Sequence, residues 1–165
     1  MERRTHLAKA LLLVALATAL ACQVTWREPR VEQPNPVVIF PSELARTCAQ
    51  LRDAIRLLGA VLEQDSVERD ACLLESAHIQ LTDSGDPVNR LGEVAYLGDQ
   101  NPFSRGRYII TASVRPTALG NTRVHLATRI EGFDGDYRVL RSRGLIERTV
   151  IERLTGLLGV GPIEE

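Results

Sequence analysis

A sustained alternation of apolar and polar residues in the second half of the chain constrains the fold more than any other feature. Between residues 108 and 130, two alternating runs flank a turn over residues 116–121, which is typical of a β-hairpin with one buried and one wet face. The positions expected to face the core are Tyr108, Ile110, Ala112, Val114, Val124, Leu126 and Ile130. Most intervening positions are polar or charged, so the sequence predicts a sheet that is covered on one side.

Two further segments have apolar residues at helical spacing. Each follows a serine that is an expected N-cap, Ser42 or Ser142, and each stops at a glycine, Gly59 or Gly159. The expected core faces consist of Leu44, Cys48, Leu51, Ile55 and Leu58 in the first helix and of Ile146, Val150, Leu154 and Leu157 in the second. The residues expected to be solvated around the second helix are Arg143, Glu147, Arg148, Glu152 and Arg153.

The order of these elements predicts the fold class. Two amphipathic helices laid over one face of an antiparallel sheet bury both apolar stripes at once, so we expect an α+β two-layer sandwich. A long segment over residues 82–106 is expected to fold back on the domain through Leu91, Val94, Tyr96, Leu97 and Phe103. Other strands are expected over residues 37–40, 61–65, 71–81 (with a bulge near Glu75) and 137–140, and turns over residues 65–70 and 132–136.

The N-terminal segment resembles the export signal of a bacterial lipoprotein. Arg3, Arg4 and Lys9 precede an apolar run over residues 10–21, which is shorter than the roughly 20 residues that span a bilayer. The run closes with Ala19-Leu20-Ala21-Cys22, which resembles a lipobox, in which the cysteine after the cleavage site receives the lipid. We therefore expect Cys22 to be the lipid-bearing N-terminus of the mature chain. The alternative is an ordinary cleaved signal in which Cys22 is incidental.

This interpretation divides the chain into four parts. They are a signal peptide (1–21), a proline-rich polar tether (22–36), a single α+β domain (37–160) and a C-terminal tail (161–165). Gln23 follows Cys22, whereas an aspartate at that place retains many lipoproteins in the inner membrane. We therefore expect a protein that is lipid-anchored in the cell envelope, at the outer membrane and facing the periplasm.

Composition excludes several function classes. No lysine follows Lys9, and a guanidinium does not release its proton, so Schiff-base chemistry and a lysine base are excluded from the mature chain. Aromatic residues make up 4% of the chain, too few for a platform that stacks single-stranded nucleic acid, so nucleic acid is not an expected partner. The histidines have no metal-binding spacing, and no nucleophile, base and orienting group occur at a recognised spacing. We expect no metal, no cofactor and no enzymatic activity.

Two cysteines remain after Cys22. Cys48 belongs to the expected core face of the first helix, and Cys72 begins an expected strand. In an oxidising periplasm the two would form a disulfide that closes a loop of about 25 residues and contributes on the order of 3 kcal/mol. The alternative is a pair of buried free thiols. A nucleophilic Cys48 would need a neighbouring base, and the two remaining histidines, His78 and His125, are both expected on strands.

Four features of the chain together resemble one known family. They are the lipobox, the strand that runs through Pro41-Ser42 into a helix, the long hairpin, and the closing helix with Ser142-Arg143-Gly144-Leu145-Ile146-Glu147-Arg148. This family is the domain of the lipoprotein C subunit of the β-barrel assembly machinery and its relatives, and the resemblance covers residues 37–158. It implies a helix-grip-like fold, no catalysis and an accessory or scaffold role at the outer membrane. The lipopolysaccharide-assembly lipoproteins share the size and the anchor, but Gln23-Val24-Thr25-Trp26 differs from the segment that usually follows their lipidated cysteine.

Charge is distributed unevenly along the chain. Residues 103–153 contain ten arginines and five acidic residues, whereas residues 22–102 contain seven arginines and thirteen acidic residues. The arginines on the non-core phase of the two hairpin strands are Arg107, Arg115, Arg123 and Arg129, which therefore share one expected sheet face. Arginine forks suit carboxylate and phosphate groups, so we expect this face to meet an anionic partner in the envelope. The alternative is a solvated face that charge keeps soluble.

Three functions follow from these observations. The first is a non-catalytic scaffold or accessory subunit of an outer-membrane complex, with an envelope protein as its partner. The second is a lipid or glycan binding module, which requires a pocket between helices and sheet or under residues 82–106. An enzyme is the third, and the chemistry set out above does not favour it.

Overall fold

The computed structural model describes residues 36–82, 85–98 and 102–163. The chain divides into two units, residues 1–30 and 31–165, and only the second contains described residues.

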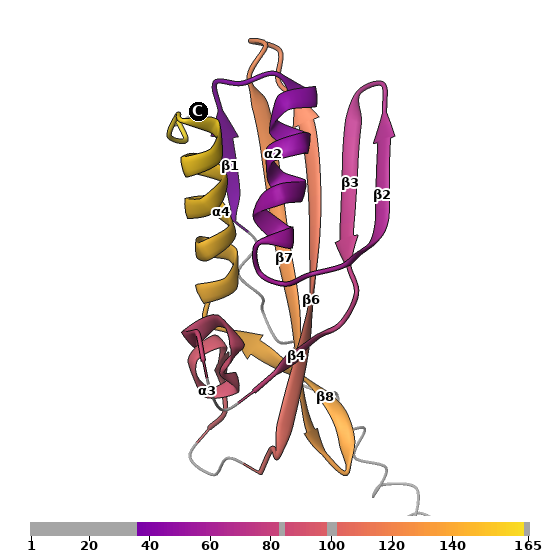
Figure 1. Cartoon of the computed structure of the whole chain (residues 1–165), viewed down its shortest axis with the longest axis vertical. Coiled ribbons are helices and arrows are strands. Elements are labelled where there is room, and N and C mark those ends of the chain that lie inside the picture. The colour runs from indigo at the N-terminus through magenta and orange to yellow at the C-terminus, as the bar shows by residue number, and fades with distance from the viewer. Residues whose placement is uncertain (1–35, 83–84, 99–101, 164–165) are drawn as a thin grey trace, which may run out of the picture. The chain divides into compact units, whose positions relative to one another are not determined.

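A long antiparallel hairpin forms the centre of the domain. The hairpin strands β6 (Arg105–Pro116) and β7 (Thr122–Asp134) are paired along their whole length (Figure 1). The other elements are β1 (Val37–Phe40), α2 (Leu44–Arg56), β2 (Leu62–Glu68), β3 (Ala71–Ser76), β4 (Ile79–Leu81), η1 (Pro87–Asn89), α3 (Leu91–Val94), β5 (Ala95–Tyr96), β8 (Asp136–Ser142) and α4 (Leu145–Leu158).

The eight described strands form an antiparallel sheet in which each half of the hairpin has its own neighbours. Around the β6–β7 turn, β3 pairs with β6 and β1 pairs with β7, with β2 outside β3. At the other end, β4 pairs with β6 and β8 pairs with β7, with β5 outside β8. The hairpin therefore joins two groups of short strands. Among the described residues, no strand of one group pairs with a strand of the other.

One face of this sheet and the two long helices share a single core. Helices α2 and α4 lie next to each other on that face (Figure 1). All seven hairpin positions predicted to face the core are buried, as are Cys48, Leu51, Ile55 and Leu58 of the first apolar stripe. The predicted α+β class is confirmed.

Three details of the helices differ from the sequence prediction. The N-cap of α2 is Glu43 rather than Ser42, and it makes no side-chain capping bond. Ser142 is the last residue of β8, and the N-cap of α4 is Gly144, whose φ of 76° suits a glycine. Leu158 rather than Leu157 completes the buried stripe of α4, because it continues the spacing of four residues from Ile146 through Leu154.

The strands also differ from the prediction in places. Strand β2 continues to Glu68 through the predicted polar turn, because it is an edge strand whose side chains are mostly exposed on both faces. The predicted strand over residues 71–81 is broken into β3 and β4, and the bulge lies in β2 between Leu62 and Gln64, opposite Glu75. Strand β7 extends through Gly132, so the predicted turn over residues 132–136 reduces to the tight turn at Gly135.

The described parts of residues 82–106 fold back on the domain, as predicted, and contain η1, α3 and β5. Leu91 and Val94 are buried and Phe103 packs against the core, but the side chain of Tyr96 is exposed. After α4 the chain returns to the sheet, where the backbone N–H of Ile163 donates to the carbonyl oxygen of Ile39. Among the described residues, no helix is long and apolar enough to cross a membrane.

Candidate functional site

The face of the sheet that points away from α2 and α4, which we call the open face, carries the four arginines singled out in the sequence. Arg115 and Arg123 lie directly opposite each other near the β6–β7 turn, and Arg107 lies opposite Glu131 at the other end. Arg129 is two residues from Glu131 on the same face. The two pairs are eight residues apart along β6, which is about 26 Å at 3.3 Å per residue. The structure therefore places the four arginines on one face but in two separate groups.

Glu131 organises the second group. Its side chain is 7% exposed, and the carboxylate accepts from Arg107 Nε at 2.7 Å and from Arg129 Nη2 at 2.8 Å. His78 Nε2 lies 3.9 Å from the same carboxylate. A carboxylate this well buried is stable only when charged donors surround it, so Glu131 and the two arginines act as a unit.

Aromatic rings hold the arginines of this group in place. The guanidinium of Arg107 lies 3.6 Å from the centre of the Tyr137 ring, and that of Arg105 lies 4.1 Å from the Phe133 ring. The two rings pack edge to face with centroids 5.1 Å apart. Such cation–π contacts fix the plane of a guanidinium.

The same arrangement continues to the edge of the sheet. Arg141 and Arg143 lie 5.3 and 5.0 Å from the exposed ring of Tyr96, and Val139 stands opposite Glu131 with 41% of its surface exposed. We call this region the arginine–tyrosine patch. It consists of Tyr96, Arg105, Arg107, Arg129, Glu131, Phe133, Tyr137, Val139, Arg141 and Arg143.

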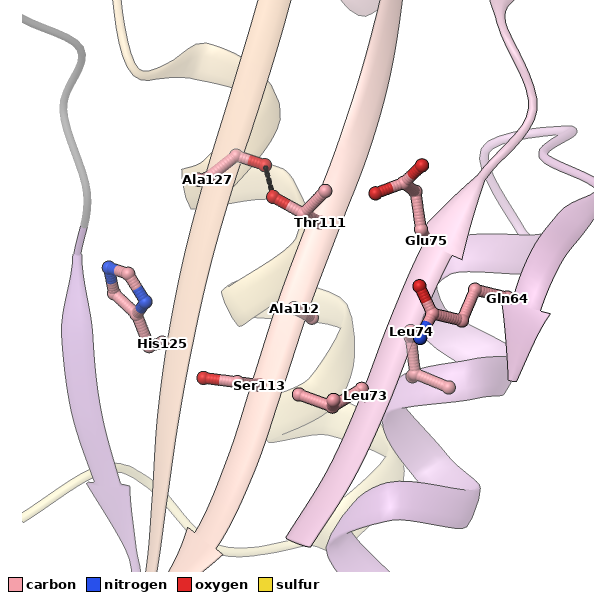
Figure 2. Close-up of a pocket in the computed structure, with 9 residues that line it drawn as sticks. All are labelled: Gln64, Leu73, Leu74, Glu75, Thr111, Ala112, Ser113, His125 and Ala127. Atoms are coloured by element: carbon pink, nitrogen blue, oxygen red, sulfur yellow. Dashed lines mark hydrogen bonds between the residues drawn. The ribbon is translucent and has the colours of Figure 1, made fainter. Parts of the chain in front are cut away.

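A hollow of about 190 Å³ lies between the two arginine groups. Its floor has the short side chains of Thr111, Ser113 and Ala127, and Figure 2 shows His125 on one side of them and Glu75 on the other. Thr111 Oγ1 donates to the carbonyl oxygen of Ala127 at 3.3 Å. The shallow centre of the open face thus has short side chains on its floor and the carboxylate of Glu75 at its side, with the arginines beyond its two ends.

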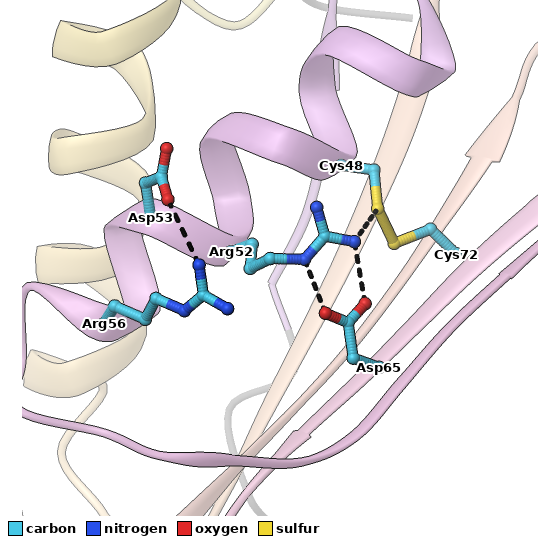
Figure 3. A network of polar contacts seen from close by, with 6 residues as sticks. All are labelled: Cys48, Arg52, Asp53, Arg56, Asp65 and Cys72. Atoms are coloured by element: carbon cyan, nitrogen blue, oxygen red, sulfur yellow. Dashed lines mark hydrogen bonds and ion pairs between the residues drawn. A yellow bond between two sulfur atoms is a disulfide. The ribbon is translucent and has the colours of Figure 1, made fainter.

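The predicted disulfide is present. Cys48 of α2 and Cys72 of β3 have their sulfur atoms 1.96 Å apart, and both residues are buried (Figure 3). Arg52 lies beside them: its guanidinium donates to both carboxylate oxygens of Asp65 at 2.6 and 2.7 Å and contacts Cys48 Sγ at 3.8 Å. This hydrogen-bonded pair lowers the pKa of Asp65 and raises that of Arg52. The group ties α2 to β3 and to the edge strand β2, which is a structural role.

Glu147, predicted to be solvated, is instead 2% exposed. The hydroxyl of Ser142 lies 3.2 Å from both carboxylate oxygens of Glu147 and accepts from the backbone N–H of Gly144. Burial raises the pKa of Glu147, and the hydrogen bonds offset this only in part. Glu147 lies on the core side of α4 because it immediately follows Ile146, where the helix meets the end of β8.

Tyr108 is a second buried titratable group. It is fully buried on the core face of β6, and its hydroxyl has no hydrogen-bond partner among the described residues. Burial raises the pKa of Tyr108 to about 12. The residue therefore acts as a large core side chain and not as an acid at neutral pH.

Glu131 and Phe133 are site residues that the sequence prediction does not single out. The alternation predicts the second hairpin strand only to Ile130, with a turn over residues 132–136. Extending the alternation by two steps would have placed both on the open face with Arg129. The pairing with Arg107 joins residues 24 positions apart, which spacing alone does not reveal.

The other predicted site residues lie apart from this group, with the exception of His78. Cys22 and residues 23–35 of the tether lie outside the described residues. His78 is near Glu131 and His125 lines the central hollow, so the two histidines are not brought together. In residues 36–82, 85–98 and 102–163, no three His, Cys, Asp or Glu side chains are placed to hold a metal ion.

No protein-family model matches the chain. No match was found among curated proteins either.

Proposed function

We propose that this protein is a non-catalytic accessory subunit of an envelope complex, anchored at the outer membrane through a lipid on Cys22, and that it docks a partner protein on the open face of its sheet. The observation that carries the proposal is the asymmetry of the sheet: α2 and α4 cover one face, and the other displays the arginine–tyrosine patch. Tyrosine and arginine are the residue types that dominate binding hot spots, which favours docking over mere solvation.

The sequence supports the anchoring half of the proposal. The basic region, the short apolar run and Cys22 have the order of a lipoprotein signal, and the proline-rich residues 23–36 would hold the domain away from the membrane. The resemblance to the C subunit of the β-barrel assembly machinery supports an accessory role rather than a catalytic one.

The alternative is a lipid or glycan binding module. Such a module needs a pocket, and a hollow does lie beside residues 82–106, between Leu81, Leu91 and Phe103. Its volume is about 120 Å³. Ligand pockets usually have about 300–1,000 Å³, so the hollow beside residues 82–106 is smaller than the pocket that such a module needs.

Two experiments in cells test the proposal. Metabolic labelling with palmitate should mark the wild-type chain and leave Cys22→Ser unlabelled; labelling that survives Cys22→Ser would contradict the anchor. Replacing Arg107, Arg115, Arg123 and Arg129 by Ser should abolish copurification of the partner after crosslinking in intact cells.

The control for the second experiment removes the same charge elsewhere. Arg56, Arg69, Arg138 and Arg148 are exposed and lie outside the group of four, so their replacement by Ser should leave copurification unchanged. Both variants are first compared by thermal unfolding, because Arg107→Ser and Arg129→Ser together remove both arginine partners of the buried Glu131. Equal loss in both variants would show that only net charge matters.

A further inference from the structure

The arginine–tyrosine patch contains a carboxylate of its own, which two of its arginines hold. Glu131 occupies the middle of the patch, with Arg107 beside it on β6 and Val139 beside it on β8. Each oxygen of the carboxylate accepts from a different arginine, within 2.8 Å.

The effect of Glu131 is to hold guanidinium groups in a fixed orientation. The guanidinium of Arg107 donates to the Glu131 carboxylate and stacks on the Tyr137 ring, so two contacts fix it. Arg129 binds the same carboxylate through one nitrogen, while 59% of its side chain remains exposed. A side chain that is already ordered loses less conformational entropy when it binds, so these arginines are prepared to receive a further acceptor.

The chemistry of the patch favours a carboxylate on a protein over a membrane surface. A guanidinium fork matches a planar carboxylate, and two arginines of the patch already bind the carboxylate of Glu131, each through one nitrogen. Beside the arginines, Tyr96 and Val139 expose apolar surface that would pack against side chains of a partner. A layer of lipid headgroups would respond to the total charge of the face and not to the orientation of two arginines.

We infer that the arginine–tyrosine patch is the energetic centre of the docking face, that it binds a carboxylate-bearing segment of the partner protein, and that Glu131 is the positioning residue that orients Arg107 and Arg129 for it. This inference rests on the proposed function, since it names the part of the open face that docks and the chemistry it receives.

The effect of Glu131→Gln on binding distinguishes orientation of the arginines from simple charge attraction, because the two predict opposite changes. Glu131→Gln makes the open face more positive, so simple attraction would strengthen the binding of an acidic partner. If Glu131 orients the arginines, the same change weakens binding. Glu75→Gln is the matched control, because Glu75 lies on the same face and lines the central hollow without touching the patch.

The measurement uses the full chain in neutral detergent and the fluorescence anisotropy of a short labelled glutamate-rich peptide, with a glutamine-rich peptide as the blank. We expect the glutamate peptide to bind the wild type, Glu131→Gln to weaken it by about fivefold or more, and Glu75→Gln to leave it unchanged or slightly tighter. Arg107→Lys keeps the charge but loses the fork, so it should weaken binding like Glu131→Gln. Circular dichroism melting of each variant shows whether the fold is retained, and Arg107→Lys, which keeps Glu131 in place, serves if Glu131→Gln unfolds.

Several results would overturn the inference. Binding of equal strength in Glu131→Gln, Arg107→Lys and Glu75→Gln would reduce the patch to nonspecific charge. Failure of the glutamate peptide to bind would show that the patch does not bind carboxylates. Displacement of the peptide by phosphatidylglycerol added to the micelles would show that the face binds lipid headgroups instead. The proposed function fails separately. If the chain copurifies a partner through the open face but does not bind the peptide, only the inference is contradicted. If the chain binds the peptide but copurifies no partner, only the proposed function is contradicted.

Discussion

A single buried carboxylate in α4 makes the stability of the domain depend on pH. The pKa of Glu147 is raised by burial, so the folded state holds this proton more tightly than the unfolded state. The contribution of Glu147 to stability is therefore fully present below the ordinary glutamate pKa and is lost as the pH rises through the raised value. Glu147→Gln removes the buried charge and should raise the free energy of unfolding at pH 7 by on the order of 1 kcal/mol.

Denaturant unfolding of the wild type and Glu147→Gln from pH 4 to pH 8 measures this effect. The difference should shrink to near zero at pH 4, where both side chains are neutral. Glu152→Gln makes the same chemical change at an exposed site of the same helix and should have little effect at either pH. A Glu147→Gln variant that is less stable than the wild type at pH 7 would show that the charged form is favoured in the core.

Gly132 leaves space for the ring of Phe103, which packs against the sheet at this point. A Cβ at this position would lie 2.7 Å from the Phe103 ring and 2.9 Å from Leu140 Cδ1, so Gly132→Ala should destabilise the domain by roughly 1–3 kcal/mol. Gly156 lies inside α4 with nothing within 4 Å of an added Cβ. Gly156→Ala should therefore stabilise by up to about 1 kcal/mol. Thermal melting of both variants decides, and similar effects at the two sites would contradict the packing described here.

At the scale of elements, the disulfide joins α2 to the sheet. Cys48 and Cys72 are 24 positions apart and both are buried, so Cys48→Ala with Cys72→Ala should lower the free energy of unfolding by about 3 kcal/mol. Urea unfolding with and without dithiothreitol provides the measurement. The reductant should shift the midpoint of the wild type and leave that of the double variant unchanged; a shift in both would show that the loss has another origin.

The elements that the sequence predicted best are those with one buried face. Apolar residues alternate in the hairpin strands and recur at helical spacing in α2, because the core covers one side of each element. The apolar period therefore indicates directly which residues are buried. Strand β2 was cut short because neither of its faces is covered, and its polar residues resemble a turn. The burial of Glu147 was missed because a charged residue beside a core stripe predicts solvent, whereas α4 turns it towards Ser142.

At the scale of the whole molecule, the open face could be predicted and its organisation could not. Alternation placed Arg107, Arg115, Arg123 and Arg129 on one face, but it did not reveal that they form two groups. That division depends on Glu131 and on Tyr137, which reach Arg107 through strand pairing and not through sequence spacing. Long-range pairing of this kind is set by register, which the turn at Gly135 fixes for β7 and β8.

Site-specific photocrosslinking in intact cells tests most directly whether the open face is the docking surface. A photoreactive residue at Val139 reports on the arginine–tyrosine patch, and one at Arg148 reports on the exposed side of α4. We expect a discrete crosslinked partner from position 139 and none from position 148, with the product lost in the variant in which the four arginines are replaced by Ser. Crosslinks from position 148 alone, or equally from both positions, would contradict the assignment of the open face as the docking surface.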